Sequence, residues 1–297
     1  MWKKKLISIV FGICLFVFQS PNIFTQPPNE KETKNKVKQY CQELEKICKQ
    51  EKDLNLARQK TIEQMKGLAN VSKQSVPYLI TEFKNKTKDP KYRYLVFTQL
   101  AYTKDEKVIQ PAIESLTDKN DEIRGYSAVF LGEMKSKNAV NPLINTLNDE
   151  NRQIRVAVCS ALGKIGDPKA IQPILKRFKK EKDFVARTDF ISYSFGKFKD
   201  ESIYSQLIES LKNDTHPDVR AAAARILGEY GDKKTIESLS DALLNDKHPL
   251  VRFYSAIALG NIGGKETIKI LNGADKTEKD NLVKTGIKKA IKNIGVK

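Results

Sequence analysis

The chain has 297 residues, 40% of them apolar and 30% charged, a size that suits one extended domain or two compact ones. Its formal net charge is +17, yet 43 of the 53 basic residues are lysines scattered along the chain, and only 10 are arginines. The planar guanidinium of arginine can bind a phosphate through two hydrogen bonds and does so better than the lysine ammonium. A lysine-rich pattern therefore favours a solvated basic surface over a nucleic-acid groove.

Residues 1–25 have the pattern of a secretory signal peptide or an N-terminal anchor. A basic start precedes an apolar run of 13 residues, which is too short to span a bilayer comfortably. We expect cleavage after Thr25, and an uncleaved segment would instead tether the protein. Lipidation of Cys14 is disfavoured because Ile13 is not the small residue usual before a lipidated cysteine. Export predicts a periplasmic or envelope-associated protein and argues further against a nucleic-acid partner.

Three cysteines follow the predicted signal, and an odd number is no disulfide framework. Cys41 and Cys48 lie seven residues apart in a predicted helix, so their Cα atoms would be about 10 Å apart, beyond the ~7 Å that a disulfide can bridge. Cys159 occupies a position that is alanine in neighbouring repeats, which predicts a small buried apolar side chain.

Two segments separate the signal from the repeats. Residues 26–36 contain Pro27-Pro28 and a charged run, which predicts a linker. Residues 37–69 have apolar residues at helical spacing, with a break near Asp53, and predict a helical N-terminal cap. The terminal faces of a solenoid need an amphipathic cover, so we expect this segment to cap the first repeat. Self-association through the same stripe is the alternative.

From residue 70 to 297 a motif recurs every 31 to 33 residues, most fully at 149–167 and 214–232. A period of this length predicts a stack of supersecondary units, each too small to bury its own apolar face. Each unit is expected to hold two helices. The first begins near a proline in the copies at Pro77, Pro111, Pro142 and Pro173, and the second ends at a Gly-Asp turn or its equivalent.

These copies resemble a known repeat. The pattern Pro-Leu-Ile-x-x-Leu-x-Asp, followed by Val/Ile-Arg-x-x-Ala-Ala-x-Ala-Leu-Gly-x-Ile-Gly-Asp, resembles the short HEAT repeat named after the bilin lyases of the phycobilisome. The resemblance implies an all-α fold, a right-handed α-solenoid of about six to seven two-helix HEAT-like repeats. Tetratricopeptide and ankyrin repeats have similar periods, but their Trp-Leu-Gly-Tyr and Thr-Pro-Leu-His signatures are missing. Residues 266–297 form a degenerate, lysine-rich last unit that suits a polar C-terminal cap.

An aspartate precedes an arginine by six residues in four copies. In HEAT-like arrays such a pair resembles the ladder that ties neighbouring repeats, so we interpret it as structural, with ligand contact as the alternative. The pairs are Asp118 and Arg124, Asp149 and Arg155, Asp214 and Arg220, and Asp246 and Arg252.

The fourth copy departs from the pattern. Its Arg187 lies nine residues before Gly196, where the other copies have eight, and aromatic residues replace the usual alanines. We expect these bulky residues to open the packing or to bend the array locally.

Aromatic residues recur on the second helices at positions that line the concave surface of HEAT-like solenoids. Exposed aromatics are enriched at interfaces, so these positions predict a groove for a protein or peptide, with packing between repeats as the alternative. The predicted groove residues are Tyr94, Tyr126, Phe190, Tyr193, Arg225, Phe253 and Tyr254.

The sequence offers little for catalysis. His216 and His248 each precede a proline at the same repeat position, as the opening of a second helix would require. A HEAT-repeat metalloenzyme that hydroxylates deoxyhypusine binds iron through His-Glu pairs, and no His-Glu dipeptide occurs here. Gly-x-Ser-x-Gly and phosphate-binding glycine loops are also missing. We therefore predict no catalytic, cofactor-binding or metal-binding residue.

These observations predict an exported, non-catalytic repeat scaffold that binds a protein or peptide on its concave face. An anionic envelope surface is a second candidate partner because of the lysine-rich exterior. The alternative is an enzyme or enzyme subunit of the bilin-lyase or HEAT-repeat oxidoreductase type.

Overall fold

The computed structural model describes residues 29–67 and 73–295. Within these ranges the chain forms sixteen α-helices, numbered α2 to α17, and no strand. The predicted signal or anchor, residues 1–25, lies outside the described residues. The predicted all-α architecture, a right-handed solenoid of two-helix HEAT-like repeats, is confirmed.

The N-terminal hairpin consists of α2 (Glu30–Gln50) and α3 (Leu54–Gly67). The prediction of a linker is wrong for residues 30–36. Asn29 caps α2 by accepting a hydrogen bond from the Glu32 N–H at 2.9 Å, so the helix begins at Glu30. The predicted apolar stripe of α2 is buried against the first repeat, and the helix break falls at residues 51–53.

Seven two-helix units follow. Their first helices are α4 (Val76–Lys84), α6 (Ile109–Glu114), α8 (Val140–Thr146), α10 (Ile171–Lys180), α12 (Glu201–Asn213), α14 (Ile236–Asn245) and α16 (Lys265–Thr277). Their second helices are α5 (Pro90–Thr103), α7 (Asp121–Glu133), α9 (Arg152–Ile165), α11 (Phe184–Tyr193), α13 (Pro217–Tyr230), α15 (Pro249–Ile262) and α17 (Asn281–Gly295).

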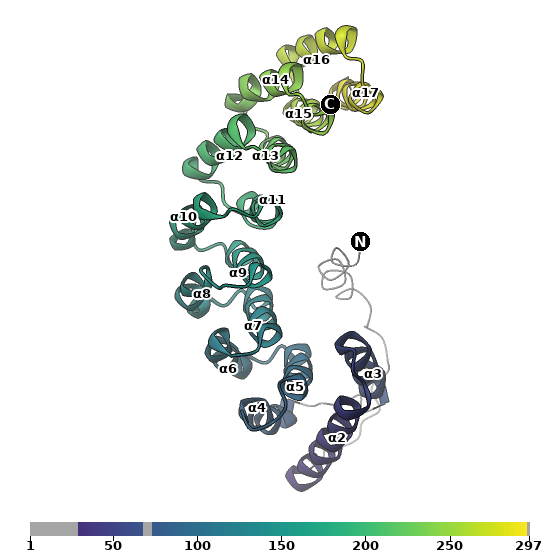
Figure 1. Ribbon diagram of the computed structural model, residues 1–297, viewed down its shortest axis with the longest axis vertical. Helices are drawn as coiled ribbons and strands as arrows, with labels where there is room; N and C mark the ends of the chain where they lie inside the picture. Colours follow the sequence, from purple (N-terminus) through teal and green to yellow (C-terminus); the bar gives the residue numbers. More distant parts are fainter. Residues whose placement is uncertain (1–28, 68–72, 296–297) are drawn as a thin grey trace.

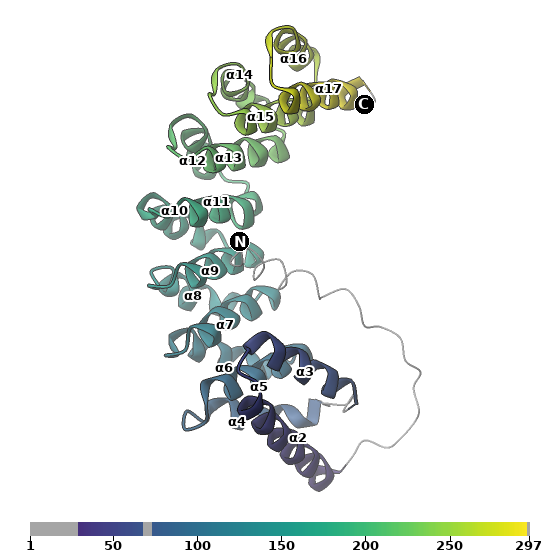
Figure 2. The ribbon, with the colours of Figure 1, turned by 45° about the vertical axis from the view of Figure 1, so that its right-hand side comes forward.

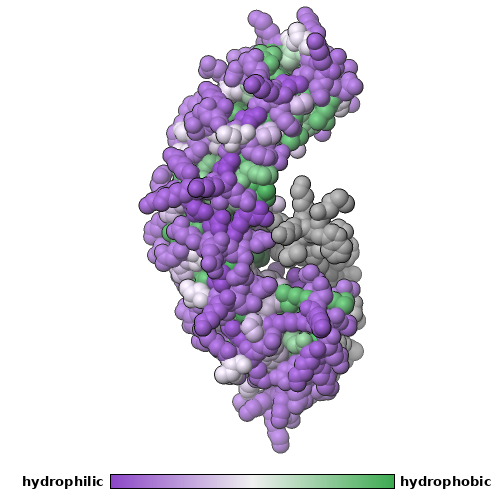
Figure 3. Space-filling view, viewed as in Figure 1, coloured by the Kyte–Doolittle hydropathy of each residue, from purple (hydrophilic) through white to green (hydrophobic). Residues whose placement is uncertain are grey.

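The units stack into a crescent. Figure 1 shows the first helices along its outer side and the second helices along its inner side. Helix α3 of the N-terminal hairpin lies against α5 at one end of the inner side (Figure 2). Hydrophilic residues dominate the outer side, whereas apolar residues reach the surface in patches along the inner side (Figure 3).

Two glycines show why the second helices can stack so closely. A Cβ atom on Gly228 would lie 2.5 Å from the Cα of Ala258, and one on Gly260 would lie 2.7 Å from the Cα of Ala290. Real Cβ atoms do not approach a backbone this closely. The first glycine of the motif, the one that follows leucine, is therefore required where α13 meets α15 and where α15 meets α17. The turn that ends a second helix uses a different glycine, such as Gly231 with φ of 70°.

The fourth unit accommodates its extra residue at the end of α11. That helix stops at Tyr193, and a 3₁₀ turn, Phe195–Lys197, completes the unit. Gly196 then faces the Ile226 side chain, with 3.3 Å from a Cβ on the glycine to Cδ1, and makes no close backbone contact. Helix α11 packs less extensively against α9 and α13 than α13 packs against α15, but α5 packs still less against α7, so looser packing is not confined to unit four.

Candidate binding face and the arginine–carboxylate ladder

Six of the ten arginines form one ladder along the array. Each of units one to six contributes one arginine, which pairs with a carboxylate of the following unit at 2.7 to 2.9 Å. The pairs are Arg93–Asp118, Arg124–Asp149, Arg155–Glu181, Arg187–Asp214, Arg220–Asp246 and Arg252–Glu278.

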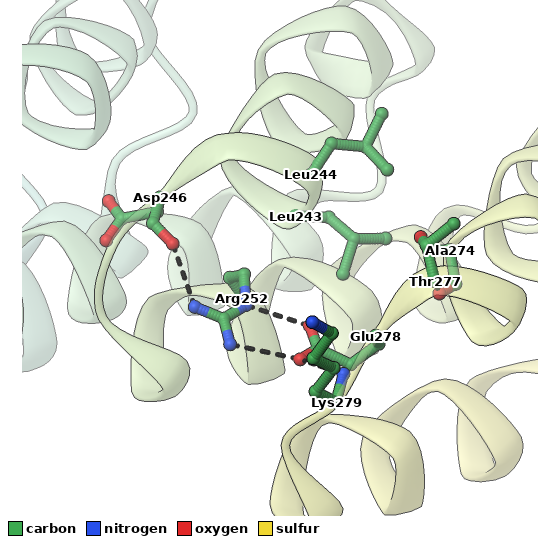
Figure 4. A pocket seen from close by; sticks show the side chains of 8 residues that line it. All are labelled: Leu243, Leu244, Asp246, Arg252, Ala274, Thr277, Glu278 and Lys279. Atoms are coloured by element: carbon green, nitrogen blue, oxygen red, sulfur yellow. Dashed lines mark hydrogen bonds and ion pairs between the residues drawn. The ribbon is translucent and has the colours of Figure 1, made fainter.

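One rung shows the common geometry. Arg220 donates from Nε and Nη2 to the two carboxylate oxygens of Asp246, at 2.7 and 3.0 Å, and from Nη1 to the backbone carbonyl of Asp214 at 2.9 Å. The Asp246 carboxylate also accepts from the backbone N–H of His248 at 2.8 Å. Figure 4 shows the following rung, in which Arg252 joins the Asp246 backbone to the Glu278 carboxylate. Each rung therefore ties together two units and the loop between two helices.

The acidic residue that lies six positions before a ladder arginine makes two different contacts, which the sequence motif alone does not distinguish. Its backbone carbonyl binds the arginine of its own unit, and its carboxylate binds the arginine of the preceding unit. The motif of an aspartate six residues before an arginine does not include Glu181 and Glu278, although both lie in the same register of their units. Arg93 was missed because Thr87 stands where its own acid would be. Arg187 belongs to the ladder, so the extra residue of unit four lies after it.

The ladder is buried most deeply at its N-terminal end. The arginine side chain is 6% exposed in the Arg93 rung and 16% exposed in the Arg252 rung. Burial, the largest single effect, would raise the pKa of Asp118, but the hydrogen bonds from Arg93 and the Asn120 backbone, together with the Arg93 and Lys86 charges, outweigh it and hold this pKa below its ordinary value. The arginines are thus fully engaged by protein groups, which favours the structural interpretation over ligand contact.

Two recesses of about 270 Å³ each open beside the last two rungs. Figure 4 shows one of them, between α14 and α16. The ladder residues in its wall, Arg252 and Glu278, already bind each other. These recesses are therefore gaps between consecutive units and offer no unpaired ladder group to a ligand.

Two of the predicted groove residues are buried, so the prediction that they line an accessible surface is wrong. Tyr94 is 8% exposed, because its ring packs on Tyr126 at 5.5 Å between centroids and α3 packs against its helix. Phe190 is completely buried. The ladder sets the register of α11 at Arg187, which places Phe190 three residues later, at a core position of the repeat.

The other predicted groove residues are half-buried. Tyr126, Tyr193, Phe253 and Tyr254 pack against the core but keep part of their surface accessible. The ring of Phe253 also fills the space above Gly286 of α17, where an added Cβ would lie 2.7 Å from Cδ2. The aromatic set therefore combines packing between repeats with partial exposure.

Helix α3 covers part of this face. The guanidinium of Arg58 lies over the Tyr126 ring, 5.9 Å from its centroid. Because α3 lies on the inner side of the crescent, this contact identifies the register of Tyr126, two residues after ladder Arg124, as one that faces inward.

The centre of the inner face carries charged residues among small ones. Arg225 of α13 is ion-paired with Glu229, and Lys164 of α9 with Glu133 of α7. Asp189 of α11 differs from these residues. Burial raises its pKa to about 6, the nearby Arg152 charge lowers it less, and the Asp183 charge raises it further.

The histidines and cysteines have structural surroundings. His216 and His248 cap α13 and α15, each accepting a backbone N–H through Nδ1 at 3.3 Å. Burial raises the pKa of Cys159 to about 12 and of Cys48 to about 11, which disfavours a reactive thiolate. In residues 29–67 and 73–295 no group of three or more His, Cys, Asp or Glu side chains is placed to hold a metal ion.

The helices of the described ranges include none that is long and apolar enough to cross a membrane. The stacked two-helix units and their ladder define an α-solenoid repeat protein. The family described as HEAT repeats matches residues 113–193 and 204–292, more than half of the chain, and the chain belongs to this family. No curated protein sequence matches it.

Solved structures with a similar arrangement have low sequence identity to this chain. The complex of CpcE and CpcF of phycocyanin lyase from Nostoc sp. PCC7120 is 17% identical, with a TM-score of 0.43, and the match covers 94% of this chain and 99% of that one. An archaeal HEAT-like repeats protein from Thermococcus onnurineus NA1 is 16% identical, with a TM-score of 0.48 and coverage of 75% and 97%. Human deoxyhypusine hydroxylase in complex with glycerol is 17% identical, with a TM-score of 0.33 and the same coverage.

Proposed function

We propose that this protein is an exported, non-catalytic scaffold that binds a protein or peptide on the inner face of its crescent. Stacked helical repeats present extended concave surfaces, and HEAT repeats generally mediate protein interactions. The signal-like pattern of residues 1–25 supports export.

The observation that carries the proposal is the placement of α3. A helix of the chain itself lies on the inner side of the first repeats, with Arg58 over the ring of Tyr126. The inner face continues past α3 along α9, α11, α13 and α15, and no other described helix covers it (Figure 1). Half-buried Tyr193 and Tyr254 lie on this part of the array. The inner face therefore already binds one helix of the chain, and its part along α9, α11, α13 and α15 is left uncovered by the other described helices.

Site-specific cross-linking tests the proposal. A photoreactive residue at Tyr254 on inner helix α15 should capture a partner from an envelope extract. The same residue at Leu244 on outer helix α14, which is 53% exposed, should not. Equal capture at both positions, or capture at Leu244 alone, would contradict binding on the inner face. Recovery of the protein only from the cytoplasm, with its first 25 residues intact, would contradict export.

A further inference from the structure

An acidic residue stands on the inner face where the other units have apolar ones. Asp189 lies two residues after ladder Arg187, the register in which Tyr126 faces α3. The corresponding residues of the other units are Leu95, Tyr126, Ala157, Ala222, Tyr254 and Gly286. An aspartate is the only charged residue in this series, so packing between repeats does not explain it.

Asp189 has no partner within the described part of the chain, where it makes no hydrogen bond and no ion pair. The basic residues around it are satisfied elsewhere: Arg152 pairs with Asp183 at 3.1 Å, and Arg225 and Lys164 have the glutamate partners described above. Asp189 is therefore a carboxylate without an ion-pair partner among the described residues of a strongly basic protein, influenced only at longer range by the Arg152 and Asp183 charges.

The contact between α3 and unit two shows which kind of side chain can lie against the position two residues after a ladder arginine. In unit two, Arg58 of α3 reaches over Tyr126, so an arginine on a helix lying along the inner face meets the residue two positions after the ladder arginine. Asp189 occupies that position in unit four. Tyr193 follows it by four residues on α11, within electrostatic reach of both Asp189 and Arg225. A carboxylate beside a tyrosine ring is a favourable environment for a guanidinium or ammonium group.

We propose that Asp189 is the docking position for a basic side chain, an arginine or lysine presented by a helical segment of the partner. This inference rests on the proposed function and names the chemistry of the partner at one point of the binding face. The long-range repulsion from the net charge of +17 is screened beyond about 8 Å at physiological salt, so the local charge decides the contact.

The electrostatics predict a pH dependence for this contact. Burial raises the pKa of Asp189 to about 6, so the carboxylate is ionised at pH 7.5 and mostly protonated at pH 5. The charged groups that act on it are Arg152 of α9 and Asp183 at the start of α11, and Tyr193 and Arg225 lie nearby. Only the ionised form attracts a cation, so affinity should fall as the pH decreases through about 6.

A peptide with the sequence of α3, Leu54–Gly67, is a suitable probe because this helix already lies on the inner face. Its affinity for the whole protein is measured by fluorescence anisotropy, alongside a peptide carrying Arg58→Gln. Protein variants are Asp189→Asn and, as a control that removes a carboxylate from exposed Glu237 on outer helix α14, Glu237→Gln. Thermal unfolding verifies that each variant is folded.

We expect Asp189→Asn to weaken binding of the arginine peptide about tenfold, less than loss of one partner of a fully buried charge pair would, because Asp189 is only partly buried; Glu237→Gln should leave binding unchanged. The Arg58→Gln peptide should bind weakly and equally to wild type and Asp189→Asn. Lowering the pH from 7.5 to 5 should weaken binding of the arginine peptide to wild type only. Equal affinity of wild type and Asp189→Asn, or no binding of the arginine peptide, overturns the inference. The proposed function would then still stand or fall by the Tyr254 cross-link.

Discussion

Replacing Gly228 by alanine tests whether the motif glycine is required by the contact between second helices. In an isolated helix the change from glycine to alanine stabilises by about 1 kcal/mol. In this array the added methyl carbon would lie 2.5 Å from both Cα and Cβ of Ala258. Carbon atoms prefer a separation of about 3.5–4.0 Å, so α13 and α15 would have to move apart by about 1 Å.

The obstructing atoms belong to a helix backbone, which cannot rotate away as a long side chain can. Overpacking of this kind costs about 1–3 kcal/mol, and we take the upper end because the backbone itself must shift. After subtraction of the gain in helix propensity, Gly228→Ala should destabilise the protein by about 2 kcal/mol.

Gly273 is the matched control, because it also lies inside a helix, α16, and a Cβ there would meet nothing within 4 Å. Gly273→Ala should therefore stabilise by up to about 1 kcal/mol. Urea unfolding followed by circular dichroism compares the two variants with wild type. Stabilisation by both substitutions would refute the argument, since it would mean that the helices separate at no cost.

Three further predictions follow from the ladder, the inner face and the helix caps. Arg93→Ala should lower the free energy of unfolding by about 3–5 kcal/mol and Arg252→Ala by clearly less, because the Arg252 side chain is more exposed than that of Arg93. Equal losses in urea titrations would contradict this order. Asp189→Asn should stabilise the protein at pH 7.5 by about 1–2 kcal/mol, a figure discounted for solvent exposure, because the fold raises the pKa of this carboxyl to about 6 and so disfavours its ionised form. That gain should be complete above the folded pKa and absent below about pH 4, the ordinary aspartate value, and a gain that persists at pH 3.5 would show another cause. His248→Asn should raise the melting temperature through a gain of about 0.5–1 kcal/mol, because asparagine is a preferred N-cap and serves α7 and α9 in the same role; an unchanged or lower melting temperature would count against the cap.

The repeat architecture was predictable because its signals are local. The period, the proline at the start of several first helices and the glycine turns each depend on a few neighbouring residues. The positions of Arg124 and Arg220 on the ladder followed from the same periodicity. Their carboxylate partners did not, because each lies in the next unit, 25 residues on for Arg124 and 26 for Arg220.

The inner face was harder to predict because its composition depends on register and on tertiary cover. The extra residue of unit four could be placed before or after Phe190, and only the ladder contact of Arg187 places it after. Tyr94 has the sequence signature of an exposed aromatic, yet α3 packs against its helix. Nothing in the weakly amphipathic sequence of α3 indicates which surface it would cover.

Hydrogen–deuterium exchange on the complex with the cross-linked partner tests the central claim most directly. If the partner lies on the inner face, amides of second helices α9, α11, α13 and α15 should exchange more slowly in the complex. Amides of first helices α8, α10, α12 and α14 should be unchanged. Protection confined to the first helices would show that the partner binds the outer side of the crescent, and the account of the inner face would be wrong.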